Sequence, residues 1–187
     1  MQDRYVFIML GFLGSGKSYV SRWLAPHVGA VYLRADALRL AMFGQDRPEL
    51  YTPENKALVN NANRYAVQQI LTSGKAHVVL DANHNAQKVR RGIADDAAQH
   101  GATAIVVWVQ TPLDIAKERT VVRRQTEGHE LFEPNLVEKM AKALESPGEG
   151  ELVITIDGQA TAAEQQASFE AQLAGIEAGL HQGSSDD

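Results

Sequence analysis

The apolar residues of this chain fall into short continuous runs that alternate with longer stretches of helical periodicity. The first run, Tyr5 to Leu10, is apolar at every position, which is typical of a strand buried on both faces of a sheet. Further strand-like runs are expected at 31–33, 77–80, 104–109 and 152–156. Strands that alternate with helices predict βαβ units, and therefore a parallel sheet that is covered on both faces.

Helical stretches separate or follow these strands. We expect helices at about 16–27, 36–43, 53–74, 85–100, 112–125, 134–144 and 162–180. Two of them begin with a threonine before a proline, at Thr52 and Thr111, which predicts a capping threonine and a proline at the first helical position. The predicted inner face of the helix after Thr52 consists of Leu58, Ala62, Tyr65, Ala66 and Ile70.

The chain shows neither a repeat nor a linker rich in glycine, proline or serine that would divide it. We therefore predict one three-layer α/β domain with five parallel strands over residues 1–182. Residues 183–187 are polar and are expected to form a disordered tail.

Composition and charge narrow the class of protein further. The 187 residues are 44% hydrophobic and 22% charged, as in an ordinary globular domain. A net charge of −5 argues against an extended nucleic-acid surface, and the absence of cysteine excludes disulfides and thiolate metal sites. The sequence contains neither a signal peptide nor a long apolar run. We therefore expect a cytoplasmic protein that does not associate with a membrane. The oligomeric state stays open.

The strongest chemical signal is a glycine-rich segment directly after the first strand. Gly11-Phe-Leu-Gly-Ser-Gly-Lys-Ser18 fits the pattern G-x-x-x-x-G-K-[ST] of a phosphate-binding loop. Glycines let backbone N–H groups approach phosphate oxygens, and the following helix points its positive end at the same anion. A lysine there reaches the β- and γ-phosphates, and the serine hydroxyl can bind Mg²⁺. The expected nucleotide-binding residues of this loop are Gly11, Gly14, Ser15, Gly16, Lys17 and Ser18.

A phosphate loop alone does not name the reaction, because GTPases, ATPases and kinases all use one. The guanine-reading pattern Asn-Lys-x-Asp is missing after the fourth and fifth strands, so ATP is expected rather than GTP. Three hypotheses remain. The leading one is a kinase that acts on a hydroxyl group of a small molecule, nucleotide or nucleic-acid end. The others are an ATPase or nucleotide-dependent switch, and a nucleotide-binding module without catalysis.

Acidic residues after the second and third strands favour the kinase. Asp36 is the candidate base that takes the proton of the acceptor hydroxyl, and Arg39 shares its helical face. Asp81 ends the third strand, where a carboxylate could join Ser18 in holding Mg²⁺. Each acid also has a plainer interpretation, as a helix cap for Asp36 and as a turn residue for Asp81.

Arginines on the helix after the fourth strand form the third kinase-like feature. Arg119 and Arg123 are four residues apart, so they share one face and could stabilise the transferring phosphoryl group. Arg119 is also expected to contact the nucleotide. Together with the polar residues that follow, they predict a lid over about 119–133 that closes and excludes water. The same spacing fits a charged, solvent-facing helix equally well.

At these residues the chain resembles the small P-loop kinases of the zeta-toxin, chloramphenicol phosphotransferase and polynucleotide 5′-kinase group. The shared pattern comprises the phosphate loop, Asp36 with Arg39, Asp81-Ala-Asn83, an arginine-bearing helix with Arg90-Arg91, and Arg119 with Arg123. The resemblance covers about residues 3–157 and implies the strand order 2-3-1-4-5. It also implies ATP with Mg²⁺, Asp36 as the base, Arg39 at the acceptor or γ-phosphate, and lid roles for Arg119 and Arg123.

The chain departs from this pattern on the acceptor side. Ala35 replaces the usual serine before Asp36, and Asn83 stands where threonine is frequent. His84 follows in place of an apolar residue. His84 and Asn85 either line the acceptor pocket or begin the next helix, for which Asn85 is a good cap. These departures concern the identity of the acceptor more than the ATP site.

Overall fold

The computed structural model describes residues 3–44, 48–74, 77–127 and 135–183. Its strands and helices alternate along the chain as the apolar pattern predicts. In order they are β1 (Tyr5–Leu10), α1 (Lys17–His27), β2 (Ala30–Arg34), α2 (Ala35–Phe43), a 3₁₀ turn (Pro48–Leu50), α3 (Pro53–Thr72), β3 (His77–Asp81), α4 (Gln87–Gln99), β4 (Thr103–Gln110), α5 (Leu113–Glu127), α6 (Leu136–Lys142), β5 (Leu152–Asp157) and α7 (Ala162–Gly183).

The strands form one five-stranded sheet of order β2-β3-β1-β4-β5, and every neighbouring pair is parallel. The predicted fold class and strand order are therefore confirmed. Because β1 is central, β3 and β4 pair with both of its edges, and since helices pack on both faces of the sheet all six of its residues are buried. The loops that follow β1, β2 and β3 consequently meet at the carboxyl edge of the sheet.

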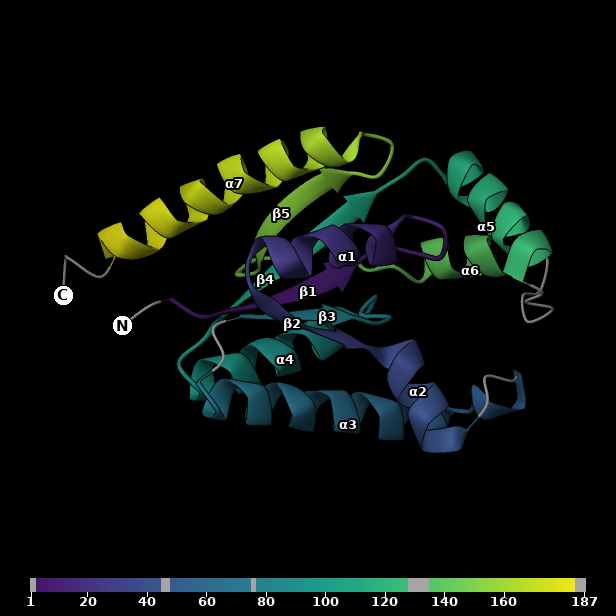
Figure 1. The fold of residues 1–187 in the computed structure, drawn as a ribbon, viewed down its shortest axis with the longest axis horizontal. Coiled ribbons are helices and arrows are strands. Elements are labelled where there is room, and N and C mark those ends of the chain that lie inside the picture. The colour runs from purple at the N-terminus through teal and green to yellow at the C-terminus, as the bar shows by residue number, and fades with distance from the viewer. Residues whose placement is uncertain (1–2, 45–47, 75–76, 128–134, 184–187) are drawn as a thin grey trace.

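Two apolar cores lie on opposite faces of the sheet (Figure 1). On one face α1 and α7 cover the strands, with Leu24 and Phe169 fully buried between helix and sheet. On the other face α3 and α4 do so, through side chains such as Leu71 and Ile93. The three layers hold the sheet rigidly, which fixes the positions of the loops at its carboxyl edge.

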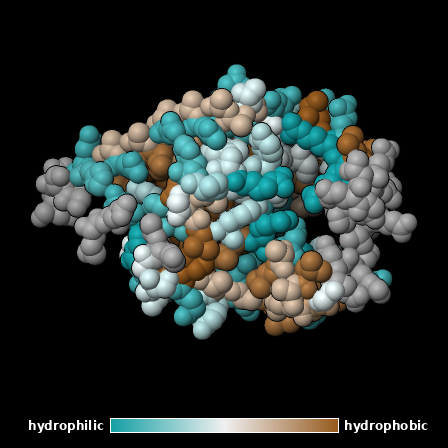
Figure 2. Space-filling view, viewed as in Figure 1, coloured by the Kyte–Doolittle hydropathy of each residue, from teal (hydrophilic) through white to brown (hydrophobic). Residues whose placement is uncertain are grey.

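Several large apolar side chains are exposed among the described residues. Figure 2 shows apolar side chains gathered over α2, where Leu40 and Met42 are 51% and 41% exposed. Among the described helices, none combines the length and the apolar character needed to cross a membrane.

The buried face of α3 differs from the predicted one. Its buried residues are Val59, Asn63, Val67 and Leu71, one position on from the predicted stripe, whereas Leu58 and Tyr65 are 52% and 63% exposed. The helix carries apolar residues on two adjacent stripes, so periodicity alone could not choose between them. Because the buried stripe has the polar Asn63 at its centre, the sequence pattern favoured the other, exposed stripe.

Only one of the predicted helix caps is found. The Thr52 hydroxyl accepts a hydrogen bond from the backbone N–H of Asn55, as expected. Thr111 is not at the N-cap position of α5, which begins at Leu113, and its hydroxyl donates to the Ser15 carbonyl in the phosphate loop. Asn85 does not cap α4, which has Ala86 at its N-cap position and no side-chain cap. The side chains of Thr111 and Asn85 instead form hydrogen bonds with residues distant in the sequence.

A buried ion pair holds the loop between β3 and α4 in place. Arg90 has a fully buried side chain, and its Nε and Nη2 donate to the two carboxylate oxygens of Glu151 at 2.7 and 3.0 Å. Its Nη1 donates to the backbone carbonyls of His84 and Asn85 at 3.0 and 3.1 Å. One guanidinium thus joins the loop after β3 to the segment that leads into β5.

A hydrogen bond from His84 joins the same loop to the central strand. Its Nδ1 lies 3.2 Å from the carbonyl oxygen of Met9 in β1. A carbonyl can only accept, so Nδ1 carries the proton and donates. Burial lowers the pKa of His84 to about 4. The hydrogen bond to Met9 acts in the opposite direction, whereas the nearby cations Lys17 and Arg90 lower the pKa further. The ring is therefore neutral at pH 7.

We expect Arg90→Met to destabilise the fold by about 3 to 5 kcal/mol, because Glu151 would be left buried without its partner. The double variant Arg90→Met/Glu151→Met should recover part of this loss, since no unpaired charge remains. Urea unfolding measures both. The control is Arg91→Met on the exposed side of the same helix, which should change stability by less than about 0.5 kcal/mol. Equal losses for Arg90→Met and Arg91→Met would show that the buried pair does not stabilise the fold.

The free energy of unfolding should fall as the pH is lowered from 6.5 to 4. Since the folded pKa of His84 is about 4 and its ordinary value is 6.5, the unfolded chain binds a proton in this window that the folded chain does not. The loss from this residue should reach about 3 kcal/mol at pH 4. His84→Asn retains an N–H donor without titrating, so its stability should decline less. Parallel pH profiles for the two proteins would exclude this role.

Candidate active site

The phosphate loop lies between the end of β1 and the start of α1, at the carboxyl edge of the sheet (Figure 1). Gly11, Gly14 and Gly16 have φ angles of 148°, 81° and 99°, a region that favours glycine. At Gly14 a β-carbon would lie 2.2 Å from the carbonyl oxygen of Ala116 in α5. The loop therefore has the tight backbone that a polyphosphate cradle requires, followed by a helix N-terminus.

Lys17 is folded back over this loop. Its Nζ donates to the carbonyl oxygens of Gly11 and Phe12 at 2.6 and 3.0 Å. Burial lowers the pKa of Lys17 to about 8, while the carboxylates of Asp81 and Asp36 act in the opposite direction. Three predicted residues, from the start of α1, the first turn of α2 and the end of β3, are thus near enough for their charges to influence one another.

Asp81 ends β3 beside the phosphate loop and is 8% exposed. Tyr32 in the neighbouring strand β2 donates its hydroxyl to Oδ2 of Asp81 at 2.8 Å. Burial, with the charge of Asp81, raises the pKa of Tyr32, so the phenol stays protonated and keeps donating. The sequence did not single out Tyr32, because a tyrosine within an apolar run also fits ordinary packing.

Ser18 and Asp81 are the residues that would hold a magnesium ion. Ser18 lies in the first turn of α1, next to Lys17. Among the described residues, no group of three or more histidine, aspartate or glutamate side chains is arranged to hold a metal. Mg²⁺ normally keeps several waters and binds through one or two carboxylates and the substrate phosphates. One hydroxyl and one carboxylate beside a phosphate cradle therefore fit this ion.

Asp36 and Arg39 lie one turn apart in α2 and form an ion pair, with Nη1 of Arg39 2.7 Å from Oδ1 of Asp36. The Arg39 side chain is 9% exposed, and its guanidinium stacks 4.4 Å from the ring centroid of Tyr51. The Asp36 side chain is 64% exposed. A fixed arginine thus orients an accessible carboxylate, which is an arrangement suited to accepting a proton from a bound molecule.

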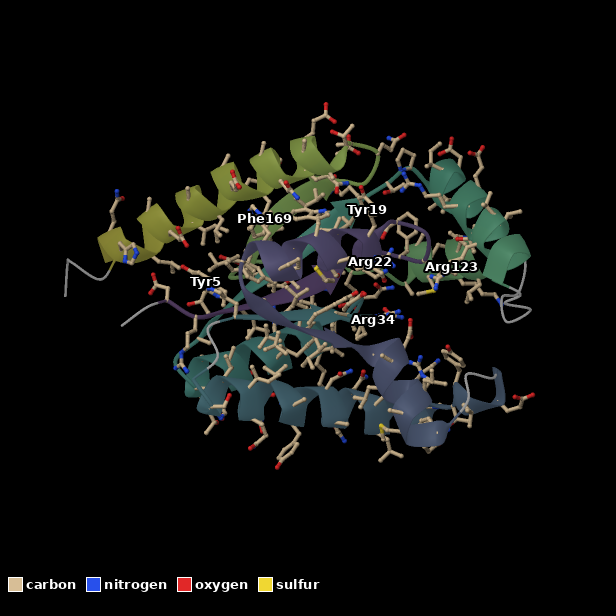
Figure 3. All side chains as sticks on the ribbon, viewed as in Figure 1. Tyr5, Tyr19, Arg22, Arg34, Arg123 and Phe169 are labelled. Atoms are coloured by element: carbon tan, nitrogen blue, oxygen red, sulfur yellow. The ribbon has the colours of Figure 1, made fainter. Side chains whose placement is uncertain are left out.

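Arg119 lies against the phosphate loop. Its Nη1 would be 3.7 Å from a β-carbon at Gly16, and its Nη2 donates to the Gly158 carbonyl at 3.0 Å. Arg123 lies one turn further along α5. Figure 3 shows the labelled Arg123 on the side of the molecule where the strands end. The two arginines therefore extend along α5 from the loop outward.

The predicted lid over 119–133 is described only in part. Residues up to Glu127 belong to α5, whereas 128–133 lie outside the described residues. Lys117 of α5 forms an ion pair with Glu138 of α6, which joins the two helices on either side of this segment. Whether the segment closes over a ligand stays a prediction.

Residues at the ends of β4 and β5 also pack against the phosphate loop. Thr111 after β4 donates its hydroxyl to the Ser15 carbonyl at 2.8 Å, and Gly158 after β5 donates its N–H to the Gln110 carbonyl at 2.7 Å. A β-carbon at Gly158 would lie 1.9 Å from Oγ1 of Thr111, so only glycine fits there. The sequence signal was the turn dipeptide Asp157-Gly158, which alone did not distinguish this role from an ordinary turn.

The loop after β3 completes the site. His84 and Asn85 are 3% and 8% exposed, and the charge of Lys17 lowers the pKa of the His84 ring.

Arg90 could have been recognised from sequence, because it lies three residues before Ile93 on the apolar stripe of its helix. A charge on such a stripe needs a buried partner, which the structure identifies as Glu151.

Comparison with solved structures finds this fold in several kinases. The chain superposes on a gluconokinase from Sinorhizobium meliloti 1021 with a TM-score of 0.72 and 19% identity, covering 98% of this chain and 99% of that one. A sugar kinase from Janibacter sp. HTCC2649 gives 0.67 and 18%, with 94% and 95% covered. Shikimate kinase from Acinetobacter baumannii, in complex with shikimate, gives 0.58 and 21%, with 94% of each chain covered.

The sequence itself matches one protein family over most of its length. No curated protein matches the chain. The family described as AAA domain (AAA_33) matches residues 6–147, from β1 through the phosphate loop, α2 and the loop after β3 to beyond α6. The match agrees with the predicted resemblance to P-loop kinases. The chain therefore belongs to this AAA domain family and has the fold of a P-loop kinase.

Proposed function

We propose that this chain is an ATP-dependent kinase that transfers the γ-phosphate of ATP–Mg²⁺ to a hydroxyl group of a small molecule or of a nucleotide or nucleic-acid end. The observation that carries the proposal is the position of the Lys17 ammonium group. It lies in a glycine cradle, where it donates to the Gly11 carbonyl at 2.6 Å, and the carboxylates of Asp81 and Asp36 are near enough for both to act on its pKa. A phosphate-binding cation, a metal-binding carboxylate and a candidate base therefore lie at one edge of the sheet.

In the proposed reaction the backbone of the phosphate loop and Lys17 hold the β- and γ-phosphates. Asp36 accepts the proton of the acceptor hydroxyl, whose oxygen forms a bond to the γ-phosphorus. The bond from that phosphorus to the bridging oxygen breaks, and ADP leaves. Mg²⁺ held by Ser18 and Asp81 would neutralise part of the negative charge of the phosphates.

The arginines have separate proposed roles. Arg119, which lies against Gly16 and Gly158, contacts the nucleotide phosphates, and Arg123 one turn away adds charge stabilisation when the lid closes. Arg39 holds Asp36 by its ion pair and faces the acceptor side. Guanidinium groups suit these roles because they remain charged and bind phosphate oxygens with two parallel hydrogen bonds.

The alternative is a P-loop ATPase or nucleotide-dependent switch with water as the only acceptor. The oriented, accessible carboxylate of Asp36 favours the kinase, because a base at this place serves an acceptor hydroxyl. Similarity to a gluconokinase, a sugar kinase and a shikimate kinase supports an acceptor of small size. ATP rather than GTP is proposed, since the chain lacks a guanine-reading motif.

Lys17→Ala should weaken the binding of Mg²⁺–ATP by about 10- to 100-fold, because charge-assisted hydrogen bonds to the phosphates are lost. Isothermal titration calorimetry measures the dissociation constant. The matched control is Lys88→Ala, which removes an exposed lysine of α4 and should leave the affinity unchanged. Unchanged affinity in Lys17→Ala would remove the basis of the proposed function.

Asp36→Asn should lower kcat by about 10²- to 10⁴-fold, the usual contribution of a general base, and leave the affinity for ATP nearly unchanged. ADP formation is measured with and without a panel of alcohols, at saturating ATP. Asp95→Asn, an exposed aspartate of α4, is the control. Rapid ADP release that no alcohol accelerates would favour the ATPase or switch instead.

A further inference from the structure

A buried glutamine joins the first turn of α7 to the turn that follows β5. Gln165 is 2% exposed, although a side-chain amide is more often found at the surface. Its Nε2 donates to the Asp157 carbonyl at 2.9 Å, and its Oε1 accepts from Nε1 of Trp23 in α1 at 3.1 Å. A carbonyl only accepts and an indole N–H only donates, so both ends of the amide are assigned.

The elements on either side of Gln165 are held independently of it. At the start of α7, the backbone N–H of Thr161 donates to Oε2 of Glu164 at 2.8 Å, and the N–H of Glu164 donates to Oγ1 of Thr161 at 3.4 Å. This reciprocal pair is a capping box, which fixes the first turn of the helix. The ring of Trp23 packs edge-on against the buried Phe169, with 5.9 Å between the ring centroids.

The turn after β5 lies directly against the phosphate loop. A β-carbon at Gly158 would lie 2.6 Å from the Ser15 carbonyl oxygen, and the N–H of Gly158 donates to the Gln110 carbonyl at 2.7 Å. Figure 1 shows this turn, between β5 and α7, on the side of the molecule where the strands end and where α5 lies. The position of the turn is therefore set by the phosphate loop on one side and by Gln165, through Asp157, on the other.

Gly158 also holds Arg119. Its carbonyl accepts from Nη2 of Arg119 at 3.0 Å, while Nη1 of the same guanidinium would lie 3.7 Å from a β-carbon at Gly16. Arg119 is an exposed residue of α5, and a long exposed side chain has many rotamers, so a fixed carbonyl restricts where its charge lies. The residue next to Asp157 thus orients an arginine at the phosphate loop.

A second glutamine of α7 bonds to β5 away from the site. The Gln172 side chain accepts from the N–H of Thr155 at 2.9 Å and donates to the carbonyl of the same residue at 2.8 Å. Thr155 lies two residues before Asp157 in the strand. The two glutamines, seven residues apart on one helix, therefore make similar bonds to one strand, but it is Gln165 that reaches the residue adjoining Gly158.

We propose that Gln165 is a positioning residue of the nucleotide site: it fixes the turn after β5 and, through Gly158, orients the Arg119 guanidinium towards the phosphates of a bound nucleotide. The proposal rests on the proposed kinase function, in which Arg119 contacts those phosphates. Both ends of the buried Gln165 amide are used within the protein, so the residue itself makes no contact with the nucleotide. Its contribution to nucleotide binding is made through Arg119.

Gln165→Met keeps the length of the side chain but removes both hydrogen bonds, and it should weaken the binding of Mg²⁺–ATP by about 3- to 10-fold. Isothermal titration calorimetry measures the dissociation constant, and circular dichroism verifies that the variant is folded. The matched control is Gln172→Met, which removes the two bonds to Thr155. It should leave the affinity within about twofold of that of the wild type.

A double-mutant cycle distinguishes positioning from a general loss of structure. Arg119→Ala should weaken the binding of Mg²⁺–ATP by about 10- to 100-fold. Adding Gln165→Met to this variant should change the affinity by less than about twofold, because the arginine through which the glutamine acts is gone. A merely structural defect would instead lower the affinity by the same factor in both backgrounds. Should Gln165→Met not fold, Trp23→Phe, which removes the indole donor, takes its place in the cycle with the same expectation.

The outcomes separate the inference from the proposed function. Unchanged affinity in Gln165→Met or in Arg119→Ala, an equal loss in Gln172→Met, or independent factors in the cycle would each overturn the positioning role, although the wild type still binds Mg²⁺–ATP. Absence of Mg²⁺–ATP binding in the wild type would instead refute the proposed function on which the role rests.

Discussion

The close approach of the phosphate loop to its surroundings is the constraint on which the site depends. α5 comes so near to Gly14 that a β-carbon would overlap the Ala116 carbonyl, and Gly11 and Gly16 adopt backbone angles that favour glycine. Thr111 and Gly158, from the ends of β4 and β5, close the loop from the other side. The shape of the cradle is therefore imposed by backbone packing before any ligand arrives, which is how a protein pre-organises dipoles for a polyanion.

A second set of polar contacts holds the loop after β3 in place. Arg90 and Glu151 are distant in sequence, yet their buried pair determines where the loop after β3 lies. His84 adds a hydrogen bond to the central strand. These groups join the loop that follows β3 to the central strand and to the segment that leads into β5. A buried charge is costly in a small domain, and here it orders a loop that apolar packing alone would leave undetermined.

Much of this architecture could be predicted from sequence, because it depends on local patterns. The apolar run Tyr5 to Leu10, the glycine motif after it and the Thr52 cap each express one simple physical rule, and the structure agrees. The predictions that were wrong concern residues with two local choices. α3 carries two apolar stripes, and only packing against the sheet selected the one with Val59. Thr111 and Asn85 have good capping chemistry, yet partners distant in sequence use them instead.

The hydrogen bond from Tyr32 to Asp81 has a consequence for how a metal would reach the site. It restricts the rotation of the carboxylate at the end of β3, because one of the two oxygens accepts from the phenol. A divalent cation at this edge of the sheet would therefore meet a carboxylate whose orientation is already set.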